Sequence, residues 1–194
     1  KEYRRQRQMC IRDRLRGIRS EVCEEIADVL YSEGFRIIEV PLNSPDPFRS
    51  IGILSQAFKS RAVIGAGTVL KKDHVKELCD AGGTLCVMPH VNPELIREAK
   101  LLGLDCIPGV STPTEALAAL DVGSEALKVF PAEIITPHVL KAWKAVLPEE
   151  SLLFPVGGIT PESMKSYVEA GADGFGLGSA LYRPVMASDE VSLK

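Results

Sequence analysis

The chain has 194 residues, of which 45% are hydrophobic and 25% charged, a composition typical of a globular domain with a sizeable core. No apolar run approaches the roughly 18–20 residues that a membrane-spanning helix needs, and no signal-peptide pattern is present. The five cysteines form no CxxC pair, and the three histidines are scattered. We therefore expect a cytoplasmic protein with reduced thiols, no membrane partner and no metal site.

The N-terminal stretch is basic, whereas the rest of the chain is acidic. Residues 1–19 carry eight Lys or Arg against two acidic residues, within a net charge of −3 for the whole chain. Arg12, Asp13 and Arg14 would place charge on both faces of a strand, which makes a poor barrel strand. We expect residues 1–14 to be non-native sequence or disordered, and the domain to span residues 15–194. A basic arm can bind nucleic acid, but this one lacks interleaved aromatic residues, so we expect no nucleic-acid partner.

Beyond this stretch, short β-rich runs alternate with amphipathic segments. A glycine precedes five of the runs, where it suits the position that follows the end of a helix. Apolar residues at three- and four-residue spacing predict helices that include residues 20–33, 71–81, 93–102 and 161–170. Eight strands are predicted, near residues 10–16, 35–40, 61–65, 84–88, 104–107, 125–130, 152–156 and 173–177.

Eight mostly apolar strands that alternate with helices predict a parallel sheet covered by helices. A (β/α)8 TIM barrel closes such a sheet most simply, and we predict this fold for a single α/β domain. A doubly wound open sheet is the alternative, but no GxGxxG motif follows the first strand. In a barrel the active site lies at the C-terminal ends of the strands, so polar residues there are the candidates for function.

Lys128 stands alone among apolar residues in the predicted strand at residues 125–130. A buried ammonium is unfavourable unless it is paired or loses its proton, and a neutral lysine amine attacks carbonyl carbon. The alternatives are a lysine that reaches solvent from the strand end, or one that pairs with a carboxylate. The pattern indicates a candidate Schiff-base lysine.

Two other strand ends carry candidate residues. Glu39 lies among β-branched neighbours, where a carboxylate either pairs with a buried cation or acts as an acid–base catalyst. A solvated glutamate is the alternative. The third strand ends in Gly65-Ala-Gly-Thr68, whose glycines let a ligand approach the backbone and whose threonine offers a hydroxyl. By itself this segment is equally consistent with a tight turn.

Glycines follow the last two predicted strands, in Val156-Gly157-Gly158 and in Gly176-Leu-Gly178-Ser179. Backbone N–H groups at glycines and at helix N-termini bind phosphate, and phosphate sites in TIM barrels commonly use these two loops. Glycines that only close tight turns are the alternative. Combined with Lys128 and Glu39, the loops predict an enzyme that forms a Schiff base with a small phosphorylated carbonyl compound.

Five motifs resemble, in the same order, those of the 2-keto-3-deoxy-6-phosphogluconate/galactonate aldolase family. They are Glu39-Val-Pro-Leu-Asn-Ser-Pro45, Gly65-Ala-Gly-Thr-Val-Leu70, Leu127-Lys-Val-Phe-Pro131, Val156-Gly-Gly-Ile-Thr-Pro161 and Gly176-Leu-Gly-Ser-Ala-Leu-Tyr182. The resemblance extends from about residue 15 to residue 182. It implies a (β/α)8 barrel, a homotrimer and class I aldolase chemistry without metal or cofactor. It also implies a truncated last helix, because the chain ends at residue 194.

Matched residue by residue, the resemblance assigns the Schiff base to Lys128 and general acid–base chemistry to Glu39. It assigns substrate binding to Arg16 at the end of the first strand, Thr68 near the pyruvyl carboxylate, Pro89 in the pocket wall, Val156, and a phosphate cradle of Gly157, Gly158, Gly178 and Ser179.

The segment Pro41-Leu-Asn43 and the residue Val156 resemble the galactonate-type members, because gluconate-type members commonly carry Thr-Leu-Arg after the valine of the second strand. The resemblance therefore implies cleavage of 2-dehydro-3-deoxy-6-phosphogalactonate to pyruvate and glyceraldehyde 3-phosphate. Two alternatives stay open: a gluconate-type aldolase, and a catalytically impaired phosphosugar-binding barrel that has lost catalysis through its altered first strand and binds pyruvate or phosphate only weakly.

Overall fold

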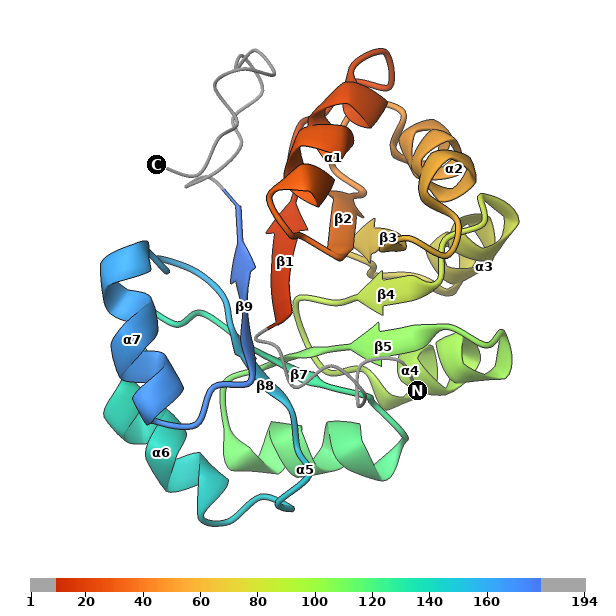
Figure 1. Ribbon diagram of the computed structural model, residues 1–194. Helices are drawn as coiled ribbons and strands as arrows, with labels where there is room; N and C mark the ends of the chain where they lie inside the picture. The colour runs from red at the N-terminus through yellow and green to blue at the C-terminus, as the bar shows by residue number, and fades with distance from the viewer. Residues whose placement is uncertain (1–9, 179–194) are drawn as a thin grey trace.

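The structure is a computed structural model that describes residues 10–178 (Figure 1). Its strands are β1 (Cys10–Arg14), β2 (Ile37–Pro41), β3 (Val63–Gly67), β4 (Leu85–Val87), β5 (Asp105–Ile107), β6 (Gly109–Val110), β7 (Leu127–Val129), β8 (Leu153–Pro155) and β9 (Gly174–Leu177). Its helices are α1 (Cys23–Ser32), α2 (Pro47–Phe58), α3 (Lys72–Asp80), α4 (Pro93–Leu101), α5 (Pro113–Asp121), α6 (Pro137–Lys144) and α7 (Pro161–Glu169).

The strands form two parallel sheets that are joined to each other. Six strands pair in the order β5-β4-β3-β2-β1-β9, and three pair in the order β6-β7-β8. A bridge between Val156 and Gly176 connects β8 to β9, and β5 leads into β6 through Pro108, whose missing N–H interrupts the strand. Because β1 lies between β2 and β9, the order is that of a TIM-barrel-like fold and not of a doubly wound open sheet.

The first strand lies where the sequence predicts one, near residues 10–16. Residues 10–14 form β1, which pairs with β2 on one side and with β9 on the other. The start of the domain at residue 15 stays a prediction. Backbone hydrogen bonds to two neighbours hold such a strand whatever its side chains are. The idea that residues 1–14 are not native coding sequence stays a hypothesis. Residues 1–9 and 179–194, with Ser179 and the predicted last helix, lie outside the described residues.

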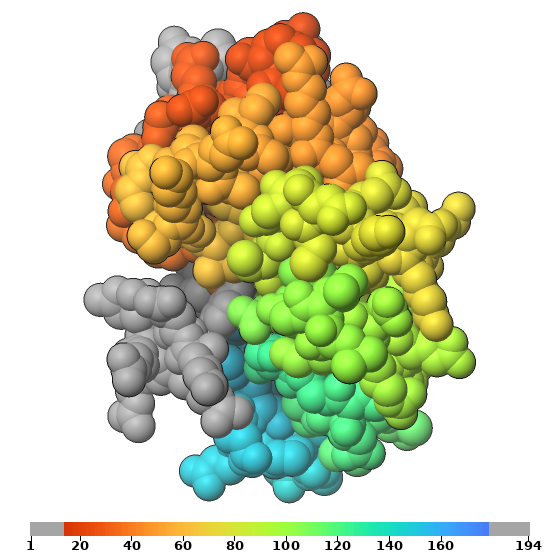
Figure 2. Space-filling model, turned by 90° about the vertical axis from the view of Figure 1, so that its right-hand side faces the viewer, coloured from red at the N-terminus to blue at the C-terminus, as the bar shows by residue number. Residues whose placement is uncertain are grey.

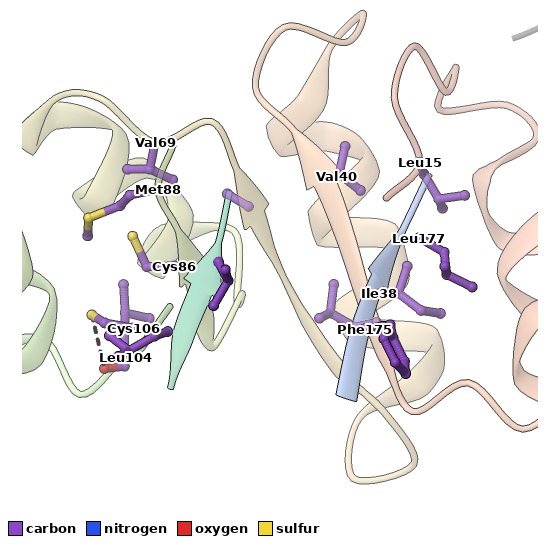
Figure 3. Packing of buried hydrophobic residues seen from close by; sticks show 14 of the residues in the cluster. Leu15, Ile38, Val40, Val69, Cys86, Met88, Leu104, Cys106, Phe175 and Leu177 are labelled. Atoms are coloured by element: carbon purple, nitrogen blue, oxygen red, sulfur yellow. Dashed lines mark hydrogen bonds between the residues drawn. The ribbon is translucent and has the colours of Figure 1, made fainter. Parts of the chain in front are cut away.

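Alternate residues of the strands fill two separate cores. The outer core lies between the sheet and the helices and includes Leu15, Ile38, Val40, Phe175 and Leu177 (Figure 3). The inner core fills the barrel interior. It consists of Ile37, Leu85, Val87, Ile107, Ala126 and Phe154, with Val63 and Leu152 packed against it. The barrel is therefore a packed solid whose interior is apolar below the C-terminal strand ends.

The helices begin where the sequence offers start signals. Proline stands at the first or second position of α2, α4, α5, α6 and α7, where its missing N–H has no intrahelical partner to lose. Side chains of Asn92, Thr112 and Thr160 accept hydrogen bonds from the first turns of α4, α5 and α7. From α2 to α5 the chain follows one side of the molecule in sequence order (Figure 2). No helix within residues 10–178 has the length and apolar character to cross a bilayer.

Two carboxylates tie neighbouring strands together near their N-terminal ends. Asp173, which precedes β9, accepts hydrogen bonds from Leu153 N in β8 at 2.9 Å and from Lys144 Nζ in α6 at 2.8 Å. Glu125, two residues before β7, likewise accepts from the backbone of β5 at 2.8 Å and pairs with Lys100 in α4. In both cases a helix is anchored to the strand that follows it, and that strand is anchored to its neighbour.

Replacing Asp173 with alanine should lower the free energy of unfolding by about 1–3 kcal/mol, because the buried Leu153 N–H and the Lys144 ammonium lose a shared acceptor. Urea unfolding followed by circular dichroism measures the loss. The control is Lys72→Ala, which removes a 3.6 Å ion pair to Glu94 between side chains that are 59% and 77% exposed. Such surface pairs contribute at most about 1 kcal/mol. Equal losses in the two variants would contradict the anchoring role of Asp173.

Candidate active site

Two charged side chains lie on the inner face, on the C-terminal side of the inner core. Glu39 follows Ile37 by two residues in β2, and Lys128 follows Ala126 by two residues at β7, so each shares its face with an inner-core residue. Glu39 is 1% exposed and Lys128 is 5% exposed. The alternatives in which either side chain extends into solvent are therefore wrong.

Lys128 is held between two neighbours of its own face. It pairs in register with Gly109 of β6 and with Phe154 of β8, which belongs to the inner core. Its Nζ lies 4.7 Å from the centroid of the Phe130 ring, within the range of a cation–π interaction. Lys128 therefore lies between an aromatic ring and a residue of the inner core.

Glu39 depends on a glycine in the neighbouring strand. A Cβ built on Gly67 would collide with Oε1, Cδ and Cγ of Glu39, so no larger residue fits there while the carboxylate keeps its position. The next residue, Thr68, has a left-handed backbone with φ of 60°, which is strained for a threonine. Thr68 is half-buried and directly follows Gly67, the glycine beside the Glu39 carboxylate. The glycines of Gly65-Ala-Gly-Thr68 therefore do more than close a turn.

The other residues expected to bind the pyruvyl end differ in burial. Pro89, just beyond β4, is half-buried. A Cβ built on Gly109 would collide with the Pro89 carbonyl oxygen, so Pro89 packs closely against β6. Arg16 is exposed. The loop that carries Arg16 is anchored by Gly17 N, which donates to Ser44 Oγ at 2.9 Å. The loops after β1 and β2 are thus connected at the same end of the barrel.

The two predicted phosphate loops lie side by side. The bridge between Val156 and Gly176 aligns the loop after β8 with the last residues of β9. Gly157 and Gly158 have φ of 102° and 63°, which only glycine adopts without strain, and Gly178 directly follows β9. Val156 itself is 3% exposed. The cradle residues within the described part of the chain are therefore brought together.

Sequence reasoning missed Glu133, which lies over the glycine pair. A Cβ on Gly157 would be 2.5 Å from Glu133 Oε2, and a Cβ on Gly158 would be 2.9 Å from Glu133 Cγ. Its charge also reaches Tyr167, whose pKa is raised first by burial and then by this carboxylate. Its position in the loop that follows the Lys128 strand could have identified it, because the loops after the strands carry the site residues of a TIM barrel.

Sequence reasoning also missed Arg14, because its charge was used only as an argument that this stretch makes a poor barrel strand. It pairs in register with Glu39, and its Nε lies 3.1 Å from the position of a Cβ built on Gly178. Among residues 10–178, no group of three or more His, Cys, Asp or Glu side chains is placed to hold a metal ion.

The comparisons with known proteins agree with this geometry. The family model for KDPG and KHG aldolases matches residues 14–191. A probable 2-dehydro-3-deoxy-6-phosphogalactonate aldolase from Rhizobium meliloti is 45% identical over 91% of this chain and 84% of its own length. The 2-dehydro-3-deoxy-6-phosphogalactonate aldolase of Escherichia coli is 44% identical over 87% of this chain and 82% of its own length.

Solved structures give the same assignment. One described as native KDPGal superposes with a TM-score of 0.93 at 40% identity, over 96% of this chain and 90% of that chain. A KDPG aldolase from Legionella pneumophila, in which pyruvate is captured as a covalent carbinolamine, superposes with a TM-score of 0.81 at 25% identity, over 89% of this chain and 84% of that one. With its family match, its relatives and a TIM-barrel-like fold in common, the chain belongs to the KDPG and KHG aldolase family.

Proposed function

We propose that this protein is a class I aldolase that cleaves 2-dehydro-3-deoxy-6-phosphogalactonate to pyruvate and glyceraldehyde 3-phosphate. The observation that carries the proposal is the burial of Lys128 and Glu39 on one inner face, beside a glycine cradle. The names of the two relatives at 44–45% identity support the galactonate substrate, since relatives named for gluconate substrates are 30–33% identical.

The first step forms a covalent bond to the substrate. The neutral amine of Lys128 attacks the C2 carbonyl carbon, and the resulting carbinolamine loses water to give an iminium. The iminium then serves as the electron sink for the next step.

The second step breaks the C3–C4 bond. Glu39, through a water molecule, accepts the proton of the C4 hydroxyl while the bond electrons move into the C2–C3 enamine. Glyceraldehyde 3-phosphate leaves, the enamine is protonated at C3, and water hydrolyses the pyruvyl imine to release pyruvate and Lys128. No redox partner is needed, because every electron pair and proton is accounted for within substrate, water and the two side chains.

The remaining residues hold the two ends of the substrate. We assign the pyruvyl carboxylate end to Arg16 and Thr68, with Pro89 in the pocket wall. We assign the phosphate to Gly157, Gly158 and Gly178, together with Ser179 beyond the described residues. Fixing both ends aligns C2 with the amine and contributes to rate by orientation.

The assembly is part of the same proposal. A homotrimer in the cytoplasm is our expectation. A protein cage designed by fusing symmetric oligomeric domains contains a chain that superposes with a TM-score of 0.92 at 40% identity, over 95% of this chain and 68% of that chain. This similarity supports a symmetric oligomer.

Lys128→Ala should abolish formation of the imine, because no other residue in the site carries an amine on the inner face of β7. Borohydride reduction in the presence of pyruvate, followed by peptide mass mapping, should place a lactyl-type adduct on Lys128 of the unaltered chain and nowhere in the variant. The control Lys165→Ala removes an exposed lysine of α7 and should keep the adduct. An adduct that persists in the Lys128 variant would overturn the assignment.

Gly67→Ala should lower kcat by about 100-fold, because the added methyl displaces the Glu39 carboxylate, and misplacement by about 1 Å costs on this order. Pyruvate release coupled to lactate dehydrogenase measures the rate. The control is Gly52→Ala in α2, where the added Cβ meets nothing closer than 3.8 Å. An unchanged kcat in the Gly67 variant would show that the position of Glu39 is irrelevant to turnover.

Glu133→Gln should strengthen inhibition by inorganic phosphate by about three- to tenfold, because a carboxylate over the glycine pair repels a phosphate dianion. The inhibition constant against substrate, compared across ionic strengths, measures the effect. Glu150→Gln removes the same charge from an exposed residue in the loop before β8 and should leave inhibition unchanged. Equal effects of the two substitutions would contradict the prediction, because the change in inhibition would then follow from the net charge of the protein and not from a local contact with Glu133.

A further inference from the structure

Arg14 lies on the inner face of β1. It pairs with Glu39 in the register of β1 and β2, and residues paired in a parallel sheet project to the same face. Glu39 faces the barrel interior, as its contact with Gly67 and its burial indicate. Leu15, the next residue, belongs to the outer core, as alternation requires.

The side chain of Arg14 reaches the last glycine of the cradle. Asp13 pairs with Leu177 of β9, so Arg14 is level with Gly178. A Cβ built on Gly178 would lie 3.1 Å from both Nε and Nη2 of Arg14, and 3.4 Å from Cζ. The absence of a side chain at Gly178 therefore makes room for the guanidinium.

This position places a fixed positive charge between the acid–base carboxylate and the phosphate loops. The bridge between Val156 and Gly176 brings Gly157 and Gly158 to the same edge as Gly178. A guanidinium presents a planar fork of N–H donors that matches phosphate oxygens, and its charge does not depend on pH in the working range. Arg14 is half-buried, so solvent ions screen it less than a surface arginine.

We propose that Arg14 is a substrate-binding residue that contacts the phosphate group of the substrate from the β1 side of the cradle. The proposal rests on the proposed function, which supplies the phosphorylated substrate. In this arrangement Arg14, beside Gly178, attracts the phosphate, and Glu133, beside Gly157 and Gly158, repels it. The balance of these two charges sets the preference for a phosphorylated over an unphosphorylated substrate.

The test compares the unaltered chain with Arg14→Ala, Arg14→Lys and a control, Arg97→Ala, which removes an exposed arginine of α4. Three quantities are measured for each protein. They are the KM and kcat of cleavage, the inhibition constant of inorganic phosphate, and the rate at which the methyl protons of pyruvate exchange with deuterium oxide. The exchange follows imine and enamine formation, and no phosphate takes part in it.

We expect Arg14→Ala to raise the KM and the phosphate inhibition constant about tenfold or more, because a charge-assisted bidentate contact is lost. The kcat and the exchange rate should stay within about twofold, Arg14→Lys should lie in between, and Arg97→Ala should match the unaltered chain. An unchanged inhibition constant would overturn the proposal. A parallel fall in exchange and cleavage would also overturn it, because Arg14 would then act on Glu39.

Failure of the proposed function gives a different result. If the unaltered chain shows no pyruvate exchange, the aldolase assignment fails, whatever Arg14 does. Calorimetric titration of inorganic phosphate into the unaltered chain, Arg14→Ala and Arg97→Ala then tests the phosphate contact alone. Equal affinities in the three proteins would refute it, and a selective loss in Arg14→Ala would support it.

Discussion

The burial of two ionisable side chains inside a packed barrel is the constraint on which this structure depends. Lys128 and Glu39 lie at inward positions almost without exposure, next to the apolar residues of the inner core. Burial of a charged side chain costs free energy. Buried ionisable side chains are therefore typical of functional sites. Strand alternation then dictates which neighbours those groups meet.

Glycines leave the space that charged side chains occupy at this end of the barrel. Gly67 leaves the space that Glu39 occupies, Gly178 leaves the space beside Arg14, and the pair Gly157 and Gly158 lies under Glu133. Each charged side chain thus packs against bare backbone, where an added methyl would displace it. Glycines in loops also leave backbone N–H groups uncovered by a side chain, and such groups can bind an anion.

Stability and chemistry are separated between the two ends of the strands. Near the N-terminal ends, Asp173 and Glu125 each connect a helix to a strand and that strand to its neighbour through backbone N–H groups and a lysine. Near the C-terminal ends, the strained left-handed backbone of Thr68 lies in the loop after β3, at the candidate site. A barrel held firmly at one end can keep unfavourable conformations at the other.

The sequence by itself determined the alternation of strands and helices, the barrel class and the choice of Lys128, Glu39 and the glycine loops as candidate site residues, because these follow from local periodicity and from residue chemistry. Only the tertiary structure decided that the first strand pairs with both β2 and β9. It also decided that Arg14 and Glu133 lie at the cradle. Their positions depend on the register between strands distant in the chain, and no local pattern encodes that register.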